Sequence, residues 1–158
     1  MEQAKPGQYL TFNLRGRPFG VPIGTVREIN RMGDITPVPK TPTFMAGVMN
    51  LRGKVIPVVD LRTKFGVETA PYTRETCIIV IEGTTGQIGT IVDSVSDVVE
   101  LKDGQIEPTP TITDDPETRY IMGIGKHENR VILLVDIVHA LAQDHLLAQN
   151  ASPEKAAS

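Results

Sequence analysis

The chain has 158 residues, of which 40% are hydrophobic and 22% are charged, and its net charge is −3. This length fits one domain or two very small ones with a shared interface, and the composition argues against general disorder. The negative charge and the dispersed Lys and Arg residues argue against nucleic acid as the main partner. One cysteine excludes an internal disulfide framework. The N-terminal residues MEQAKPGQ lack the apolar segment of a signal peptide, and no apolar run reaches the ~20 residues of a membrane helix. We therefore expect a cytoplasmic protein with no direct membrane insertion.

The first third of the chain predicts short strands and extended segments. Residues 1–7 are expected to form a flexible tail. Strands or extended segments are predicted at YLTFNL (9–14), FGVPIGTVREI (19–29) and DITPVPKTP (34–42). Pro22 and Gly24 interrupt the second of these and indicate an edge, a bulge or a bend. Three prolines fix the third as an extended arm.

Residues 47–66, GVMNLRGKVIPVVDLRTKFG, predict a β-hairpin followed by a short helical turn. Two apolar runs flank Arg52-Gly53, and Gly53 can supply the positive φ that a two-residue turn requires. Asp60 can cap a helical turn over LRTKF that ends at Gly66. The hairpin exposes Arg52, which indicates either a recognition site or an ordinary solvated turn.

The second half begins after a polar segment, residues 68–76, which is the best candidate for a linker. Strands are predicted at 77–81, 87–92, 94–101 and 130–135. Apolar residues recur with helical spacing from 137 to 148 and predict a C-terminal amphipathic helix. Residues 149–158 are expected to form a second flexible tail.

The second half repeats the pattern of the first, with an offset that grows from 68 to 76 residues. The aligned pairs are YLTFN (9–13) with CIIVI (77–81), VREI (26–29) with VSDV (95–98), ITPVP (35–39) with IEPTP (106–110), and residues 55–61 with 131–137. The sequence therefore predicts two copies of one β-rich unit, at 8–67 and 76–142. Each copy is too small to bury much core alone, so the copies are expected to pack together and leave a groove between them.

No residue pattern supports catalysis, a cofactor or a metal. His139 and His145 are six residues apart, a spacing that does not place them on one helix face. Asp60 and Asp136 occupy matching places in the two copies, before helical runs, so helix caps are a better interpretation than a catalytic carboxylate pair. We expect no enzymatic activity.

Glu28 and Arg52 are the pair of greatest interest in the first copy. Both occupy positions expected to be exposed, and apolar residues flank them: Val26, Ile29, Val48 and Leu51. An apolar patch with a charged rim is typical of an interaction surface, and Arg is frequent at the energetic centres of interfaces. The alternative is a routine surface ion pair.

Several segments resemble the CheW family, the coupling proteins of bacterial chemotaxis signalling. The resemblance runs over nearly all of residues 8–142, and it is carried by YLTFNL, VREI, DITPVP, GVMNLRGKVIPVVDLRTKFG and VDSVSDVVEL. It implies a mainly β fold of two intertwined five-stranded barrels of the SH3-like type, with short helices and with the first strand pairing partly with the second barrel. It also implies a non-catalytic adaptor, without cofactor, that links transmembrane chemoreceptors to the histidine kinase CheA.

The resemblance also assigns roles to residues of the first copy. It places Val26, Glu28, Asn50, Leu51, Arg52 and Gly53 on the surface that contacts the regulatory domain of the kinase and the receptors. It places Leu14, Val26, Ile29 and Leu51 in an apolar groove for the cytoplasmic tip of the receptors, and Val48 lies beside them in the sequence patch. The second barrel is expected to add a weaker kinase contact. Two alternatives stay open: a coupling protein of a related non-flagellar chemosensory array, and a β-barrel ligand-binding module outside signalling.

Overall fold

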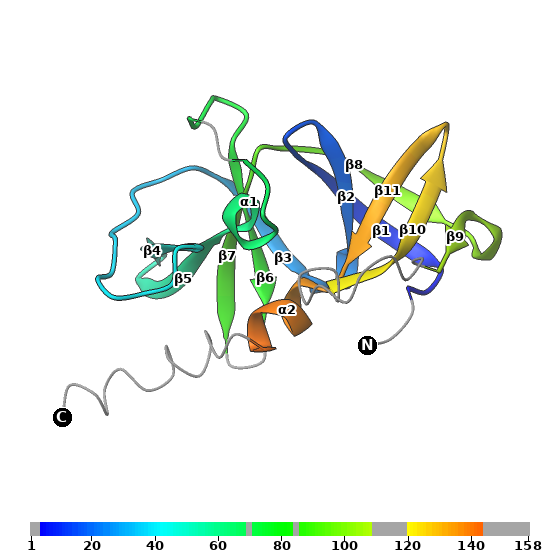
Figure 1. Cartoon of the computed structure of the whole chain (residues 1–158). Helices are drawn as coiled ribbons and strands as arrows, with labels where there is room; N and C mark the ends of the chain where they lie inside the picture. Colours follow the sequence, from blue (N-terminus) through cyan, green and yellow to red (C-terminus); the bar gives the residue numbers. More distant parts are fainter. Residues whose placement is uncertain (1–3, 69–70, 84–85, 109–119, 144–158) are drawn as a thin grey trace.

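The computed structural model describes residues 4–68, 71–83, 86–108 and 120–143. Within these residues the fold is mainly β, as predicted, with two sheets joined side by side and a few short helices (Figure 1). The helices are η1 (Ile23–Thr25), α1 (Leu61–Lys64), η2 (Asp103–Gln105) and α2 (Ile137–Gln143). None of the helices in the described part of the chain is long and apolar enough to cross a membrane.

One sheet has five strands and the other has six. The five-stranded sheet has the order β3 (Val26–Arg31), β6 (Cys77–Glu82), β7 (Gln87–Val92), β5 (Lys54–Asp60) and β4 (Met45–Leu51). The six-stranded sheet has the order β8 (Ser94–Leu101), β1 (Gly7–Leu14), β2 (Arg17–Pro22), β11 (Arg130–Val135), β10 (Ile121–His127) and β9 (Ile106–Glu107). The sixth strand is the short β9, whose counterpart in the other sheet is a single bridge between Thr36 and Val48.

The two copies of the repeat exchange strands. The first two strands, β1 and β2, join the six-stranded sheet, while β6 and β7 of the second copy join the five-stranded sheet. In each sheet, strands from the two copies form one parallel pair: β2 with β11 in the six-stranded sheet, and β5 with β7 in the five-stranded sheet. The predicted ranges 8–67 and 76–142 therefore describe the two copies and not the two sheets, because each range supplies strands to both. This exchange is the intertwining that the resemblance implied.

The core has three parts because each sheet buries both faces. The shared core between the sheets includes Phe12, Leu14, Val59, Ile79, Ile81 and Ile137. The far face of the five-stranded sheet buries the Ile78 cluster, which is Met49, Ile56, Val58, Ile78, Val80 and Ile91. The far face of the six-stranded sheet buries Tyr9, Val99, Leu101, Ile132 and Leu134. Successive residues of a strand point to opposite faces, so neighbours such as Ile78 and Ile79 serve different cores.

Asp60 and Asp136 are both helix caps, as predicted. The Asp60 carboxylate accepts a hydrogen bond of 3.0 Å from the backbone N–H of Arg62. The Asp136 carboxylate accepts one of 2.9 Å from the backbone N–H of His139. Each side chain satisfies a backbone donor at the start of its helix, which is the ordinary role of an Asp at this position.

The chain ends differ from the predictions where the structure describes them. The backbone N–H of Ala4 donates to the carbonyl of Met122 over 3.1 Å, and Gly7 already belongs to β1, so residues 4–7 are anchored and do not form a loose tail. The predicted strand 19–29 is divided by η1, because Pro22 ends β2. The C-terminal helix is described to Gln143, and the rest of the predicted helix and the tail 149–158 lie outside the described residues.

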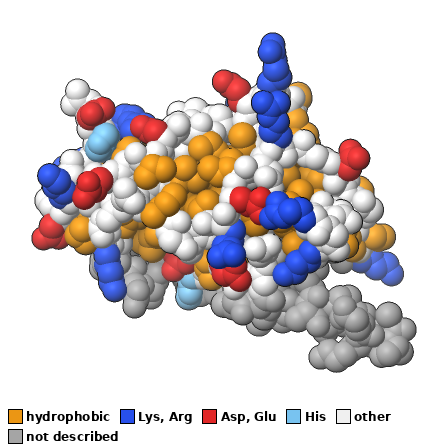
Figure 2. All heavy atoms as spheres, turned by 180° about the vertical axis from the view of Figure 1, so that it is seen from behind, with side chains coloured by type: hydrophobic (Ala, Val, Ile, Leu, Met, Phe, Trp, Pro, Cys, Tyr) orange, Lys and Arg blue, Asp and Glu red, His pale blue; other side chains and the backbone are white. Residues whose placement is uncertain are grey.

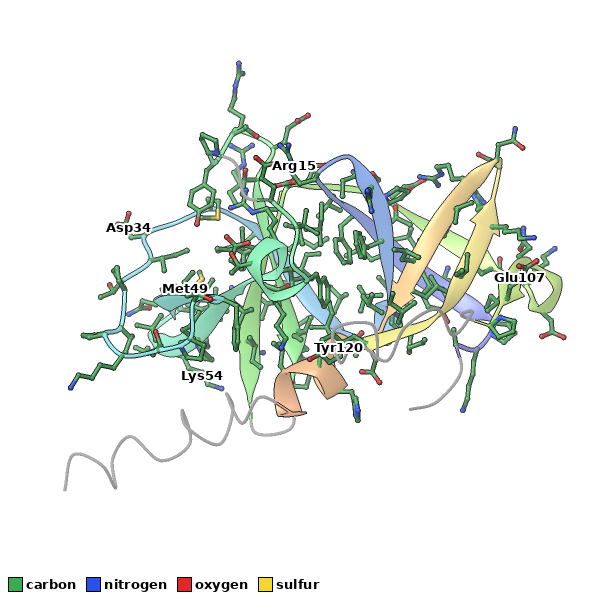
Figure 3. The ribbon with its side chains drawn as sticks, viewed as in Figure 1. Arg15, Asp34, Met49, Lys54, Glu107 and Tyr120 are labelled. Atoms are coloured by element: carbon green, nitrogen blue, oxygen red, sulfur yellow. The ribbon has the colours of Figure 1, made fainter. Side chains whose placement is uncertain are left out.

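Two buried cations join the copies near α1. The Arg62 side chain is 2% exposed and pairs with Asp60 over 3.0 Å and with Asp93 over 3.1 Å. The Lys64 ammonium lies 4.8 Å from the ring centre of Phe44 and 5.0 Å from that of Tyr120. Figure 3 shows Tyr120 near the centre of the molecule, between the two sheets. Neither cation was expected to be buried, since charged residues are seldom buried without partners.

Candidate functional site

The β4–β5 hairpin is a tight two-residue turn, as predicted. Leu51 pairs with Lys54, and the two residues between them have positive φ, 53° at Arg52 and 86° at Gly53. This is the pattern of the turns that match the twist of a hairpin. The Asn50 side-chain oxygen accepts a hydrogen bond of 2.8 Å from the Gly53 N–H and fixes the turn. The positive φ of Gly53 was predicted, whereas that of Arg52 was not and is unusual for a residue with a side chain.

The turn brings Arg52 to Glu28, which lies on β3 and is 24 residues away in sequence. The Arg52 Nη1 donates to Glu28 Oε1 over 3.0 Å, and Nη2 donates to Oε2. The Arg52 side chain is 68% exposed, whereas that of Glu28 is 24% exposed. The two residues singled out from the sequence therefore form an ion pair, and its two-bond geometry fixes the orientation of both groups.

Electrostatics keep both members of this pair charged. The hydrogen bond from Arg52 holds the pKa of the Glu28 carboxyl below its ordinary value. The same bond raises the pKa of the Arg52 guanidinium. The site therefore presents a carboxylate and a guanidinium at neutral pH, with part of the guanidinium open to solvent.

A β-bulge in β3 separates Val26 from Glu28. Val26 lies opposite Ile81, but Glu28 lies opposite Val80, so the register with β6 shifts between them. Ile81 belongs to the shared core and Val80 to the Ile78 cluster. Val26 and Glu28 therefore face opposite sides of the sheet, although their spacing predicts the same side, because the bulge adds a residue to one strand.

The predicted site residues consequently divide between two faces of the five-stranded sheet. Leu51 packs against the Ile78 cluster, on the side where Glu28 lies. Val26 and Val48 pack against the shared core. Ile29 lies opposite Ile79 of the shared core and is 43% exposed. The sequence predicted one patch, whereas the structure has a charged face at the hairpin and an apolar face beside the shared core.

Leu14 does not belong to either surface. Its side chain is 0% exposed and packs in the shared core. The groove position predicted for Leu14 is therefore wrong, because the strand exchange buries the end of β1 between the two sheets.

The second copy has an equivalent hairpin whose side chains differ from those of the first. Its hairpin also has two central residues with positive φ, Glu128 and Asn129, so the turn has the same type and was not expected from its sequence. The acidic residue equivalent to Glu28 is Asp97, which pairs with Arg130 of β11 over 3.5 Å. The Thr11 hydroxyl also donates to Asp97 over 2.6 Å. The scaffold is thus duplicated, while the side chains at the turn are not.

Hydrophobic and charged side chains meet on one face of the molecule. Figure 2 shows hydrophobic side chains gathered across the middle of the rear face, with acidic and basic side chains beside them. Figure 3 shows Met49 and Lys54 on the β4–β5 hairpin, at the opposite end of the molecule from Glu107. Among the described residues no group of three or more His, Cys, Asp or Glu side chains is arranged to hold a metal ion. The arrangement suits recognition of another protein.

Comparisons with known proteins agree on one family. The model of the CheW-like domain matches residues 8–145. The chemotaxis protein CheW of Klebsiella aerogenes is 36% identical over 139 residues, which are 88% of this chain and 84% of that protein. The chemotaxis protein CheW of Rhizobium meliloti is 37% identical over 130 residues, which are 82% and 84%. The crystal structure of the scaffolding protein TtCheW from Thermoanaerobacter tengcongensis superposes with a TM-score of 0.80 at 33% identity, covering 86% of this chain and 92% of that one.

Proposed function

This chain belongs to the CheW-like domain family, and from that premise we propose that it is a non-catalytic adaptor of bacterial chemotaxis signalling. It couples the cytoplasmic tips of transmembrane chemoreceptors to the regulatory domain of the histidine kinase CheA. The observation that carries this proposal is the exposed ion pair between Arg52, at the turn of the β4–β5 hairpin, and Glu28 of β3. In the cell the protein is cytoplasmic and is recruited to membrane-associated receptor arrays.

The division of the site into two faces supports two kinds of contact. The charged face at the hairpin suits the kinase, because a guanidinium with free donors can bind acidic or carbonyl groups at a polar interface. The apolar face, with Val26, Ile29 and Val48, suits an apolar helical surface such as a receptor tip. An adaptor with separate faces can hold both partners at once.

The decisive experiment titrates the full chain with the CheA regulatory domain and, separately, with a receptor-tip fragment. We expect Arg52→Ala to weaken kinase binding by about tenfold or more, since Arg is a common hot-spot residue. We expect Ile29→Lys to weaken receptor binding instead, because it places a charge on the apolar face. Arg17→Ala, at an exposed position of β2, is the matched control and should change neither affinity.

Thermal melting of each variant separates lost contacts from lost folding. Arg52 and Ile29 are both exposed, so the variants should melt within a few degrees of the unaltered protein. If the unaltered protein binds neither partner, the adaptor proposal is wrong. If Arg52→Ala folds normally and binds both partners with unchanged affinity, the hairpin is not part of the site.

A further inference from the structure

Asn30 lies next to Glu28 on the same face of β3. Glu28 is opposite Val80 and Asn30 is opposite Ile78, and both of these β6 residues belong to the Ile78 cluster. Both positions follow the bulge, so the ordinary two-residue alternation of a strand holds between them. The carboxylate of Glu28 and the amide of Asn30 are therefore neighbours along the strand.

The Asn30 amide has an unused donor. Its Nδ2 atom is shielded from solvent and has no hydrogen-bond partner among the described residues. The amide is nevertheless near enough to Glu28 to contribute to the lowering of the pKa of that carboxyl, after the larger effect of Arg52. Shielded donors without partners are rare in folded proteins and are unfavourable, so this one calls for an explanation.

In the second copy a different residue supplies the neutral donor near the equivalent carboxylate. There the Asp97 carboxylate forms an ion pair of 3.5 Å with Arg130 and accepts a hydrogen bond from the hydroxyl of Thr11 on β1. In the first copy the place equivalent to Thr11 is occupied by Ile79, whose side chain cannot donate a hydrogen bond. Asn30 is the neutral side-chain donor beside Glu28, and its equivalent in the second copy is Val99. Each carboxylate thus has an arginine partner and a neutral side-chain donor near it, which is bonded to the carboxylate in the second copy and unused in the first.

We propose that Asn30 is a positioning residue of the docking site. Its side-chain amide donates a hydrogen bond to the Glu28 carboxylate and holds it in place when Arg52 turns away toward an acidic group of the partner. This inference rests on the proposed function, in which Arg52 contacts the kinase. Arg52 is mostly exposed and its guanidinium is hydrogen-bonded to Glu28, so the side chain can rotate outward when that bond breaks. Glu28 is more enclosed and would lose its partner by that rotation, unless a second donor keeps it in place.

The first test needs no partner and measures the carboxyl pKa of Glu28 by NMR in the full chain. Arg52→Ala should raise this pKa toward its ordinary value, and adding Asn30→Val should raise it further. Asn30→Ser, which keeps a neutral donor, should recover most of that change. Arg27, the other charge that lowers this pKa, stays unaltered in all variants. If Asn30→Val has no effect in the Arg52→Ala background, the inference is wrong.

The second test measures binding of the same variants to the CheA regulatory domain. Asn30→Val should weaken binding about three- to tenfold and Asn30→Ser should restore it. In the Arg52→Ala background Asn30→Val should have little further effect, because the two residues act through one carboxylate. Equal losses in both backgrounds would overturn the inference. If the unaltered chain does not bind the kinase, the proposed function fails, whereas the NMR titration still decides the role of Asn30 toward Glu28.

Discussion

Arg62 is a buried cation that ties the two copies together. Its side chain donates from Nε and Nη2 to the two carboxylate oxygens of Asp60 and from Nη1 to Asp93. Asp60 ends β5 of the first copy, whereas Asp93 lies between β7 and β8 of the second. The hydrogen bond from Arg62 to Asp60 raises the pKa of the guanidinium, so the side chain stays charged inside the protein. Both carboxylates stabilise the charge there, and the guanidinium also lies 5.3 Å from the ring centre of Tyr72.

We therefore expect Arg62→Met to destabilise the fold by about 2–4 kcal/mol, since it leaves two partly buried carboxylates without their cation. Arg62→Lys keeps the charge but cannot bind Asp60 with two bonds, so its loss should be smaller. Urea denaturation of both variants at neutral pH measures the two losses. A loss below about 0.5 kcal/mol for Arg62→Met would show that the cluster adds no net stability.

At the scale of elements, the extended arm before β4 is fixed by one glycine. The backbone groups of Thr36 and Val48 exchange two hydrogen bonds, of 2.8 and 2.9 Å, so the arm crosses the outer edge of β4. Gly47 has a φ of 146°, and a Cβ added there would lie 2.2 Å from the Thr36 carbonyl oxygen. The arm can lie this close only because position 47 has no side chain.

Gly47→Ala should accordingly cost about 2–4 kcal/mol of unfolding free energy, because both the clash and the positive φ oppose it. Gly53→Ala is the matched control: its φ of 86° is also unfavourable, but a Cβ there meets nothing within 4 Å, so about 1 kcal/mol is expected. Denaturant unfolding of the two variants gives the comparison. Equal losses would mean that the approach of the arm to β4 is unimportant for stability.

Local sequence signals predicted the turns and helix caps correctly. They predicted less well on which face of a sheet each side chain lies. The hairpin at Arg52-Gly53 and the cap at Asp60 follow from a turn signal and a capping residue, which act over a few residues. The bulge that separates Val26 from Glu28 depends on the register with β6, which lies about fifty positions further along the sequence. The burial of Leu14 likewise depends on strands from the other copy. Such long-range pairings leave no periodic signal in the strand itself.

For the whole molecule, the repeat predicted two units, and the strand exchange decides how they are joined. Neither copy holds all strands of a sheet, because β1 and β2 pair with β8 and β11 while β6 and β7 pair with β3 and β5. The shared core likewise takes residues from both copies, such as Phe12 and Ile137. The sequence offset showed the duplication, but it carries no information about which copy pairs with which. A single copy of about 65 residues is also near the lower limit for a stable domain.

The exchange predicts that cutting the linker will not separate the copies. A protease site inserted before Pro71, in the predicted linker, leaves every strand intact when it is cleaved. The two fragments should then elute together in native buffer and separate only in denaturant, since two parallel strand pairs and the shared core hold them. Each fragment expressed alone should show no cooperative unfolding transition, because its strands lack their partners.

The uncleaved protein with the inserted site is the control for effects of the insertion. Fragments that separate in native buffer and each melt cooperatively would show that the copies fold as independent barrels, and that the exchange does not hold the molecule together.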